Sequence, residues 1–389
     1  MFIEKLLQLM AEKKASDIFI SAGSPISIKI SGTIMPVNPQ PMDAEMAKKV
    51  IYEMLKPEQI ETFEKTQELN FSKPMTGLGN FRVNCFWQKG AASCVIRYIT
   101  ADIPKMADLN LPPVLSTLIT EKRGLILVVG ATGSGKSTTL ASMIDFRNEV
   151  GPGHILTMED PVEYVFTPKK CIINQREVGN DTHSFHDALR NAMRQAPDII
   201  LIGEIRDLET MRMALTYALS GHLCLATLHA NNAYQAMNRV ISFFPLEVRP
   251  MLLQDLSVSL KAVVSQRLIK TTTGGRAPAV EVLLNTRNVQ ELIEKGEITE
   301  IKEAMEKSMS PGSQTFEQDL FRLVRSGKIS TDEALANADS ATNLGLLLGN
   351  SGIMPAATER AKRGPSPGSV PGGPSFGDFK ITEDTEERL

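Results

Sequence analysis

The chain has 389 residues, 42% of them hydrophobic, which is enough for two domains with sizeable cores. A formal net charge of −3 argues against a dedicated nucleic-acid-binding protein, because such proteins usually carry a basic excess or a basic stripe. The four cysteines form no C-x-x-C pair, so the sequence indicates neither a zinc ribbon nor a disulfide framework. Isolated cysteines of this kind fit a reducing compartment.

The first fifteen residues predict an amphipathic helix that packs on its own domain rather than on a membrane surface. They are not a signal peptide, because Glu4 and Lys5 interrupt the apolar run. No other apolar run approaches the ~20 residues that a membrane-spanning helix needs, so we expect a cytoplasmic protein. The apolar side of the predicted helix carries Phe2, Ile3, Leu6, Leu7 and Met10.

Residues 1–105 have the pattern of a small α+β domain with an antiparallel sheet. After the first helix, residues 15–38 alternate apolar and polar side chains around glycine and proline, which is typical of strands joined by turns. A helix is expected at 44–55. Residues 81–99 predict two further strands, separated at Lys89-Gly90.

The character of the sequence changes after a proline-marked linker at 106–113. Apolar strands then alternate with helical segments, which predicts a parallel sheet with crossover helices in a domain that spans 114–350. Expected strands cover 124–130, 154–160, 198–204 and 223–230, and expected helices cover 135–150, 184–195 and 208–220.

Helix-capping signals support this interpretation, since Ser184 with Asp187 resembles a capping box and Gly221 stands where a helix would stop. After about residue 245 we expect a mostly helical chain, in which Ser330 with Glu333 marks the start of a late helix. Residues 351–389 are rich in Pro, Gly and Ser and cannot supply a core, so they predict a disordered tail.

Residues 130–137 read GATGSGKS, which fits G-x-x-x-x-G-K-[ST] directly between an expected strand and an expected helix. In such a loop, backbone N–H groups and the positive end of the helix surround the phosphates of a nucleotide. Lys136 would reach the β- and γ-phosphates of ATP, and the Ser137 hydroxyl would ligate Mg²⁺. The predicted nucleotide-binding residues are Gly130, Thr132, Gly133, Ser134, Gly135, Lys136, Ser137 and Thr138.

Glu204 ends the strand expected at 198–204, at the edge that faces the ligand in parallel sheets. It is the candidate that orients and activates the attacking water. The residue before it, where a magnesium-binding Asp usually stands, is Gly203. Mg²⁺ would therefore depend more on Ser137 and on another acid.

Candidates for that other acid lie in TMEDPVEY, residues 157–164, which follows the neighbouring strand. Glu159, Asp160 and Glu163 could converge on a cation or a water molecule. The alternative is a solvated acidic loop, because clusters of charge usually face water.

Histidines also mark the strand expected at 223–230. His229 could hydrogen-bond the γ-phosphate. Alternatively, His229 and His222 each hydrogen-bond only to backbone groups nearby in the chain. His183 and His186 have i,i+3 spacing but no further ligands, so we expect them at the surface.

An arginine that meets the developing charge accelerates phosphoryl transfer by about 10³–10⁵-fold. Arg190 and Arg194 precede the Glu204 strand, and Arg82 and Arg97 belong to the first domain. The alternative for each is an ordinary surface ion pair. An arginine from the first domain, or from a neighbouring subunit, would link domain position to hydrolysis.

Five segments stand in the order found in secretion and pilus ATPases: ASDIFISAG, GATGSGKSTT, LTMEDPVEY, RQAPDIILIGEIRD and SGHLCLATLHAN. The last four match the motifs called Walker A, Asp box, Walker B and His box. Over about residues 1–345 the chain resembles the type IV pilus retraction branch, the twitching-motility ATPases PilT and PilU. Residues 312–330 and the following ADSATNL are most similar to PilU. The tetracysteine zinc insertion of assembly and type II secretion ATPases is absent from the sequence.

This resemblance implies a PAS-like N-terminal domain and a RecA-like C-terminal domain in a homohexameric ring that binds ATP and Mg²⁺ between the domains. It implies a PilT-type retraction ATPase and an inner-membrane pilus platform protein as partners, without nucleic acid or zinc, and a location on the cytoplasmic side of the pilus base. Nucleotide and Mg²⁺ would be bound by Lys136 and Ser137. The resemblance makes Glu204 the catalytic carboxylate. It also implies that the following residues belong to the site: the Asp-box acids Glu159 and Glu163, the His-box residues His222 and His229, and one of the first-domain arginines Arg82 and Arg97.

One segment departs from the PilT pattern. PilT-type retraction ATPases carry A-I-R-N-L-I-R-E, whereas residues 288–295 read NVQELIEK, with Gln290 and Glu294 in place of the arginines. Leu292 and Ile293 remain, so a helix with an altered charged face is expected. This favours an accessory, PilU-like motor that works with a PilT-type partner.

Three other functions fit the sequence less well. The intact GKS motif and Glu204 argue against a nucleotide-gated scaffold that hydrolyses little ATP. The acidic pI argues against a nucleic-acid motor on the same fold. The missing zinc motif disfavours a type II secretion ATPase.

Overall fold

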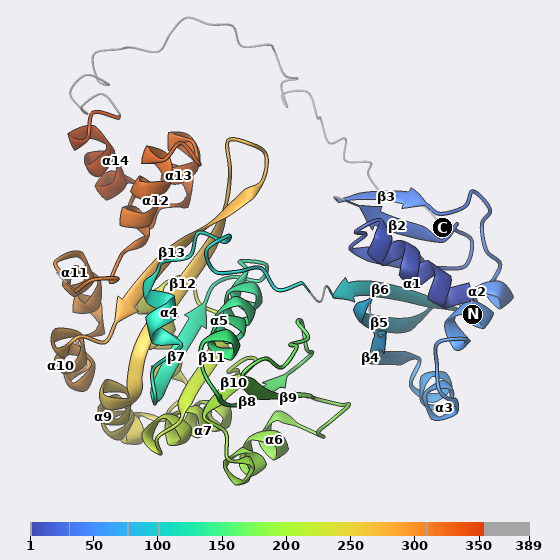
Figure 1. Cartoon of the computed structure of the whole chain (residues 1–389), viewed down its shortest axis with the longest axis horizontal. Helices are drawn as coiled ribbons and strands as arrows, with labels where there is room; N and C mark the ends of the chain where they lie inside the picture. The colour runs from blue at the N-terminus through green and yellow to red at the C-terminus, as the bar shows by residue number, and fades with distance from the viewer. Residues whose placement is uncertain (1, 31, 76–77, 100–101, 309, 354–389) are drawn as a thin grey trace, which may run out of the picture.

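The computed structural model describes residues 2–353 apart from 31, 76–77, 100–101 and 309, and these residues form two units, each built on its own sheet (Figure 1). The first unit has a six-stranded antiparallel sheet in the order β3-β2-β1-β6-β5-β4. The second has a seven-stranded, mainly parallel sheet in the order β13-β12-β7-β11-β10-β8-β9. The predicted fold class, an α+β unit followed by a parallel α/β unit, is confirmed.

Helix α1 of the first unit packs on its own sheet, as expected. Ile3, Leu7 and Met10 are fully buried, whereas Phe2 is 49% exposed and does not belong to the buried side. The break at Lys89-Gly90 is confirmed, since both residues have positive φ in a tight turn between two paired strands. The elements are α1 (Phe2–Glu12), β1 (Asp17–Ile20), β2 (Ser27–Ile30), β3 (Thr33–Pro36), α2 (Ala44–Tyr52), α3 (Pro57–Thr66), β4 (Glu68–Met75), β5 (Gly79–Gln88) and β6 (Ala91–Ile99).

The strands and helices predicted between 124 and 230 are all present in the second unit. Strands β7, β10 and β11 are buried along their whole length, which explains their continuous apolar runs. Edge strand β9 was not predicted. The elements are α4 (Val114–Leu118), β7 (Gly124–Val129), α5 (Lys136–Val150), β8 (Gly153–Glu159), β9 (Cys171–Glu177), α6 (Phe185–Ala192), β10 (Ile199–Ile202), α7 (Leu208–Leu219) and β11 (Leu223–Leu228).

The expectation of a mostly helical chain after about residue 245 is wrong for 260–284. Strand β12 (Leu260–Lys270) pairs in parallel with β7, and β13 (Arg276–Leu284) pairs antiparallel with β12. Both strands are largely buried on both faces, so they lack the alternation that identifies a half-buried strand. The remaining elements are α8 (Ala233–Ser242), α9 (Arg249–Ser259), α10 (Arg287–Lys295), α11 (Ile301–Glu306), α12 (Phe316–Arg325), α13 (Thr331–Asn337) and α14 (Ala341–Asn350).

The predicted caps form. The Ser184 hydroxyl accepts a hydrogen bond from the Asp187 N–H at 3.0 Å, and the Ser330 hydroxyl accepts one from the Glu333 N–H at 3.2 Å. Most of the predicted disordered tail, from residue 354 onward, lies outside the described residues. Between residues 2 and 353, none of the described helices has the length and apolar character needed to cross a bilayer.

Successive residues of the central strands point to opposite faces of the second sheet and contribute to two separate hydrophobic cores. Leu125, Leu127 and Val129 of β7 face the core under α6 to α10, and Ile126 and Val128 face the core under α4 and α5. The sheet is thus covered by helices on both faces, and its strand ends lie at an edge that the helices leave open (Figure 1).

A buried carboxylate joins β13 to the start of α8. Glu281 is 3% exposed, and it accepts hydrogen bonds from the Ala233 N–H at 2.7 Å and the Ser265 hydroxyl at 2.9 Å. Burial raises the pKa of Glu281 to about 7. Asp339 adds to this increase, while the hydrogen bonds and Arg267 oppose it.

We predict that Glu281→Gln stabilises the protein in a pH-dependent way. The pKa of Glu281 in the folded protein lies above the usual value of 4.5. The free energy of unfolding of the wild type therefore decreases as pH rises from about 4.5 to 7, by at most on the order of 3 kcal/mol. The melting temperature of the variant minus that of the wild type should therefore increase over this window and become constant above pH 8. A difference that is the same at every pH would contradict the prediction.

Candidate functional site

A cavity of about 670 Å³ lies at the C-terminal ends of β7, β8, β10 and β11. The loop before α5 and the strand-end residues line one side, and Arg82 and Arg97 of the first unit line the other. This edge is where ligands bind in open parallel sheets. The cavity therefore lies between the two units.

The loop at 130–135 has the shape of a phosphate cradle. Gly133 and Gly135 have φ of 77° and 90°, in the left-handed region that favours glycine. A Cβ at Gly130 would lie 2.5 Å from the Gln266 carbonyl oxygen, so no larger residue fits there. Lys136 donates hydrogen bonds to the carbonyls of Gly130 and Ala131 at 2.9 and 3.0 Å, which closes the loop over its ammonium group. Burial lowers the pKa of Lys136, and Glu204 and Glu163 oppose this shift.

The side chain of Gln266 in β12 hydrogen-bonds to this loop. No sequence motif marked Gln266 as a site residue. Its side-chain amide donates to the Ser134 carbonyl at 2.8 Å and accepts from the Thr139 hydroxyl at 2.6 Å. Gln266 is 3% exposed. In the sequence, Gln266 stands in the polar stretch 265–267 between apolar residues.

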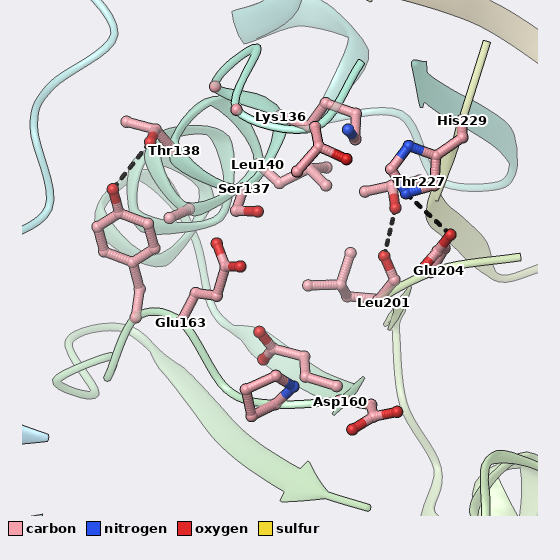
Figure 2. Close-up of a pocket in the computed structure, with 18 of the residues that line it drawn as sticks. Lys136, Ser137, Thr138, Leu140, Asp160, Glu163, Leu201, Glu204, Thr227 and His229 are labelled. Carbon is pink, nitrogen blue, oxygen red and sulfur yellow. Dashed lines mark hydrogen bonds and ion pairs between the residues drawn. The ribbon is translucent and has the colours of Figure 1, made fainter. Parts of the chain in front are cut away.

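Glu204 follows β10 and projects into the cavity between two basic side chains. One carboxylate oxygen lies 2.7 Å from Arg206 Nε, and the other lies 3.1 Å from His229 Nε2, as Figure 2 shows for the histidine. Arg206 also lies 3.7 Å from Asp160. The structure thus brings Glu204 and His229, two separately predicted site residues, into contact and adds Arg206, which no sequence motif marked.

The three acids after β8 do not occupy equivalent positions. Glu163 points toward Ser137 at the start of α5, whereas Asp160 lies farther from that helix (Figure 2). Glu159 is partly buried and accepts hydrogen bonds from the Thr157 hydroxyl at 2.7 Å and from Gln175 at 3.4 Å. Burial raises the pKa of Glu159 to about 7. Asp160 and Glu163 are both exposed, so the solvated acidic loop describes these two acids and not the partly buried Glu159.

Two further contacts tie the strand ends together. The hydroxyl groups of Thr138 and Tyr164 lie 2.8 Å apart, which joins α5 to the acidic loop (Figure 2). Thr227 of β11 donates to the carbonyl of Gly203. These contacts hold the walls of the cavity at fixed positions.

Other histidines and arginines that the sequence raised lie away from the cavity. His222 precedes β11 at the opposite edge of the sheet, beside Ser220 and Tyr217. His183 and His186 are exposed, as expected, and His186 pairs with Glu209. Arg190 and Arg194, in or just after α6, are exposed and do not line the cavity.

The two arginines of the first unit differ in their surroundings. Arg97 forms an ion pair with Asp17 at 2.9 Å, and the Asp17 side chain is 7% exposed. Arg82 is exposed and has no hydrogen-bond or ion-pair partner within the described ranges. Arg276 of β13 also lines the cavity, although no sequence motif marked it.

The donors present fit a nucleotide phosphate chain with Mg²⁺. Glycines, a lysine and a helix N-terminus surround the place for phosphate. The Ser137 hydroxyl and the Glu163 carboxylate are oxygen donors, which Mg²⁺ prefers. In the described part of the chain, no group of three or more His, Cys, Asp or Glu side chains is arranged to hold a metal ion by itself.

Comparisons with known proteins agree with this geometry. The model of the family "Type II/IV secretion system protein" matches residues 1–336. The type IV pilus ATPase PilU of Pseudomonas aeruginosa is 48% identical over 349 residues, covering 90% of this chain and 91% of that protein. The type IV pilus retraction ATPase PilT of the same organism is 42% identical, covering 87% of this chain and 98% of that protein.

A solved structure is similar as well. The crystal structure of the pilus retraction motor PilT with bound ADP matches with a TM-score of 0.81 and 39% identity, over 86% of this chain and 96% of that one. The chain therefore belongs to the type II/IV secretion system protein family, within its group of type IV pilus ATPases that includes PilT and PilU.

Proposed function

We propose that the chain hydrolyses ATP to ADP and phosphate and thereby acts as a motor of the type IV pilus machinery. The observation that carries this proposal is the meeting of three features at one cavity. These are the phosphate loop with Lys136, the carboxylate of Glu204, and the guanidinium of Arg82 from another unit. The names of the similar proteins supply the cellular context.

Each residue has a role that follows from its position. The loop N–H groups, Lys136 and Thr138 bind the phosphates, with Gln266 holding the loop in shape. Glu204 orients a water molecule toward the γ-phosphate and takes up its proton, while Arg206 and His229 hold the carboxylate in place. Bound through Ser137 and Glu163, Mg²⁺ would neutralise charge on the phosphates.

The position of Arg82 supports coupling of hydrolysis to movement. An arginine from the first unit stabilises the transition state only when the two units are correctly placed. Domain displacement and hydrolysis are then linked, which is the property a motor requires. We propose that six copies assemble into a ring in which each copy uses this device.

The surface of α10 supports an accessory role beside a PilT-type motor. The expected helix is present, with Ile293 fully buried and Leu292 packed on the core. Glu294 is exposed and Gln290 is partly exposed. We propose that the ring works with a PilT-type partner on an inner-membrane platform protein, from the cytoplasmic side, without nucleic acid.

We predict that Glu204→Gln lowers kcat for ATP hydrolysis by about 10²–10⁴-fold, because the amide cannot accept the proton of the attacking water. Steady-state phosphate release measures kcat, and equilibrium binding of a fluorescent ADP analogue should be unchanged. Glu247→Gln, an exposed glutamate outside the cavity, is the matched control. If the wild type binds ATP without turnover, the chain is a nucleotide-gated scaffold instead.

We predict opposite phenotypes for the two first-unit arginines. Arg82→Ala should lower kcat by about 10²-fold or more with an unchanged melting temperature, because its guanidinium meets charge only during the reaction. Arg97→Ala should lower the melting temperature, because it leaves the buried Asp17 carboxylate unpaired. Both quantities are measured on both variants. A larger loss of kcat in Arg97→Ala than in Arg82→Ala would reverse the assignment.

A further inference from the structure

A second buried carboxylate lies outside every motif described above. Glu177 at the end of β9 is 6% exposed. The hydroxyl of Ser72 lies 2.8 Å from one of its oxygens and 2.9 Å from the other. The N–H of Val162 donates to Glu177 at 2.9 Å, and the side-chain amide of Asn180 donates to it as well. A buried carboxylate with three donors is a firm anchor.

This anchor joins the two units. Ser72 belongs to β4, the edge strand of the first sheet, and Glu177 belongs to β9, the edge strand of the second. Figure 1 shows β4 on the side of the first unit that faces β9. Among the residues that the structure describes, the hydrogen bonds between the two sheets all pass through the Glu177 carboxylate.

The register of the first sheet connects this anchor to the cavity. Ser72 pairs with Arg82 across β4 and β5, Arg82 pairs with Arg97 across β5 and β6, and Arg97 pairs with Asp17 across β6 and β1. Directly opposed residues in antiparallel strands share one face, with Cβ atoms about 5 Å apart. The hydroxyl that docks on Glu177 is thus one strand away from the unpaired guanidinium of Arg82.

The same carboxylate also holds the acidic loop. Val162, whose N–H it accepts, stands next to Glu163 and two residues after Asp160. Val162 is itself buried, so this stretch of backbone has little freedom to move. One side chain therefore contacts both the unit that supplies Arg82 and the loop that supplies Glu163.

We propose that Ser72 and Glu177 form a positioning pair that docks the first unit on the second and so sets where Arg82 lies over the phosphate end of the cavity. Neither residue lines the cavity. The pair acts through Arg82 and the acidic loop, and its role in turnover rests on the ATPase function proposed above. Movement of the first unit during a motor cycle would require this contact to break and re-form.

The test compares Ser72→Ala, which removes the hydroxyl, with Ser72→Thr, which keeps it. Ser72→Ala should lower kcat by about 10-fold or more, since a misplacement near 1 Å can cost about 10² in rate. It should also reduce the preference for a non-hydrolysable ATP analogue over ADP, while ADP affinity stays unchanged. Ser72→Thr should restore both quantities.

A double variant with Arg82→Ala tests the coupling. If Ser72 acts through Arg82, then Arg82→Ala should cost much less in the Ser72→Ala background than in the wild type. Ser27→Ala is the matched control, because the Ser27 hydroxyl donates only to Pro25 within the first unit, at 3.1 Å. Glu177→Gln, which places a donor against the Asn180 amide, should behave as Ser72→Ala does.

The outcomes separate this proposal from the function on which it rests. If the wild type does not hydrolyse ATP, the ATPase proposal fails. The preference for the ATP analogue over ADP, compared between the wild type and Ser72→Ala, then still tests whether the pair positions Arg82. Should the wild type hydrolyse ATP while Ser72→Ala matches Ser27→Ala in kcat and in nucleotide preference, the positioning pair is overturned. Full additivity of Ser72→Ala and Arg82→Ala would also overturn it.

Discussion

The closed shape of the loop at 130–135 is the constraint on which the rest of the site depends. Gly130 must be glycine because Ser134 and Gln266 occupy the space beside it. Gln266 holds the loop from β12 and also contacts Thr139 in α5. A strand outside the motif therefore supports the shape of the loop, because the pairing of β12 with β7 places Gln266 beside it.

Around that loop, several charged groups face groups of opposite charge. Lys136 faces Glu204 and Glu163, and Glu204 is held by Arg206 and His229. Arg82 of the first unit and Arg276 of β13 also line the cavity, and neither has an ion-pair partner within the described residues. In the proposed function, a triphosphate would bring negative charge to the cavity that Lys136 and Arg82 line, and nucleotide binding and domain position would then affect each other.

Much of the fold follows from local patterns, and the failures have physical causes. The strands at 124–130, 198–204 and 223–230 were predictable because buried parallel strands are short apolar runs between helices. Strands β12 and β13 were missed because apolar runs without alternation do not distinguish a strand from a buried helix. Within the site, Arg206 was overlooked although it stands two residues after Glu204, since proximity in sequence does not reveal which side chains turn toward each other.

The sequence by itself determined the phosphate loop, the acid at the strand end, the two-unit organisation and the family, because these depend on short motifs and on periodicity along the chain. Only the tertiary structure decided which partners those residues have. Arg97 meets Asp17 across 80 positions, Ser72 meets Glu177 across 105, and Gln266 meets Ser134 across 132. No local pattern encodes such pairs, because the packing of whole sheets brings their members together.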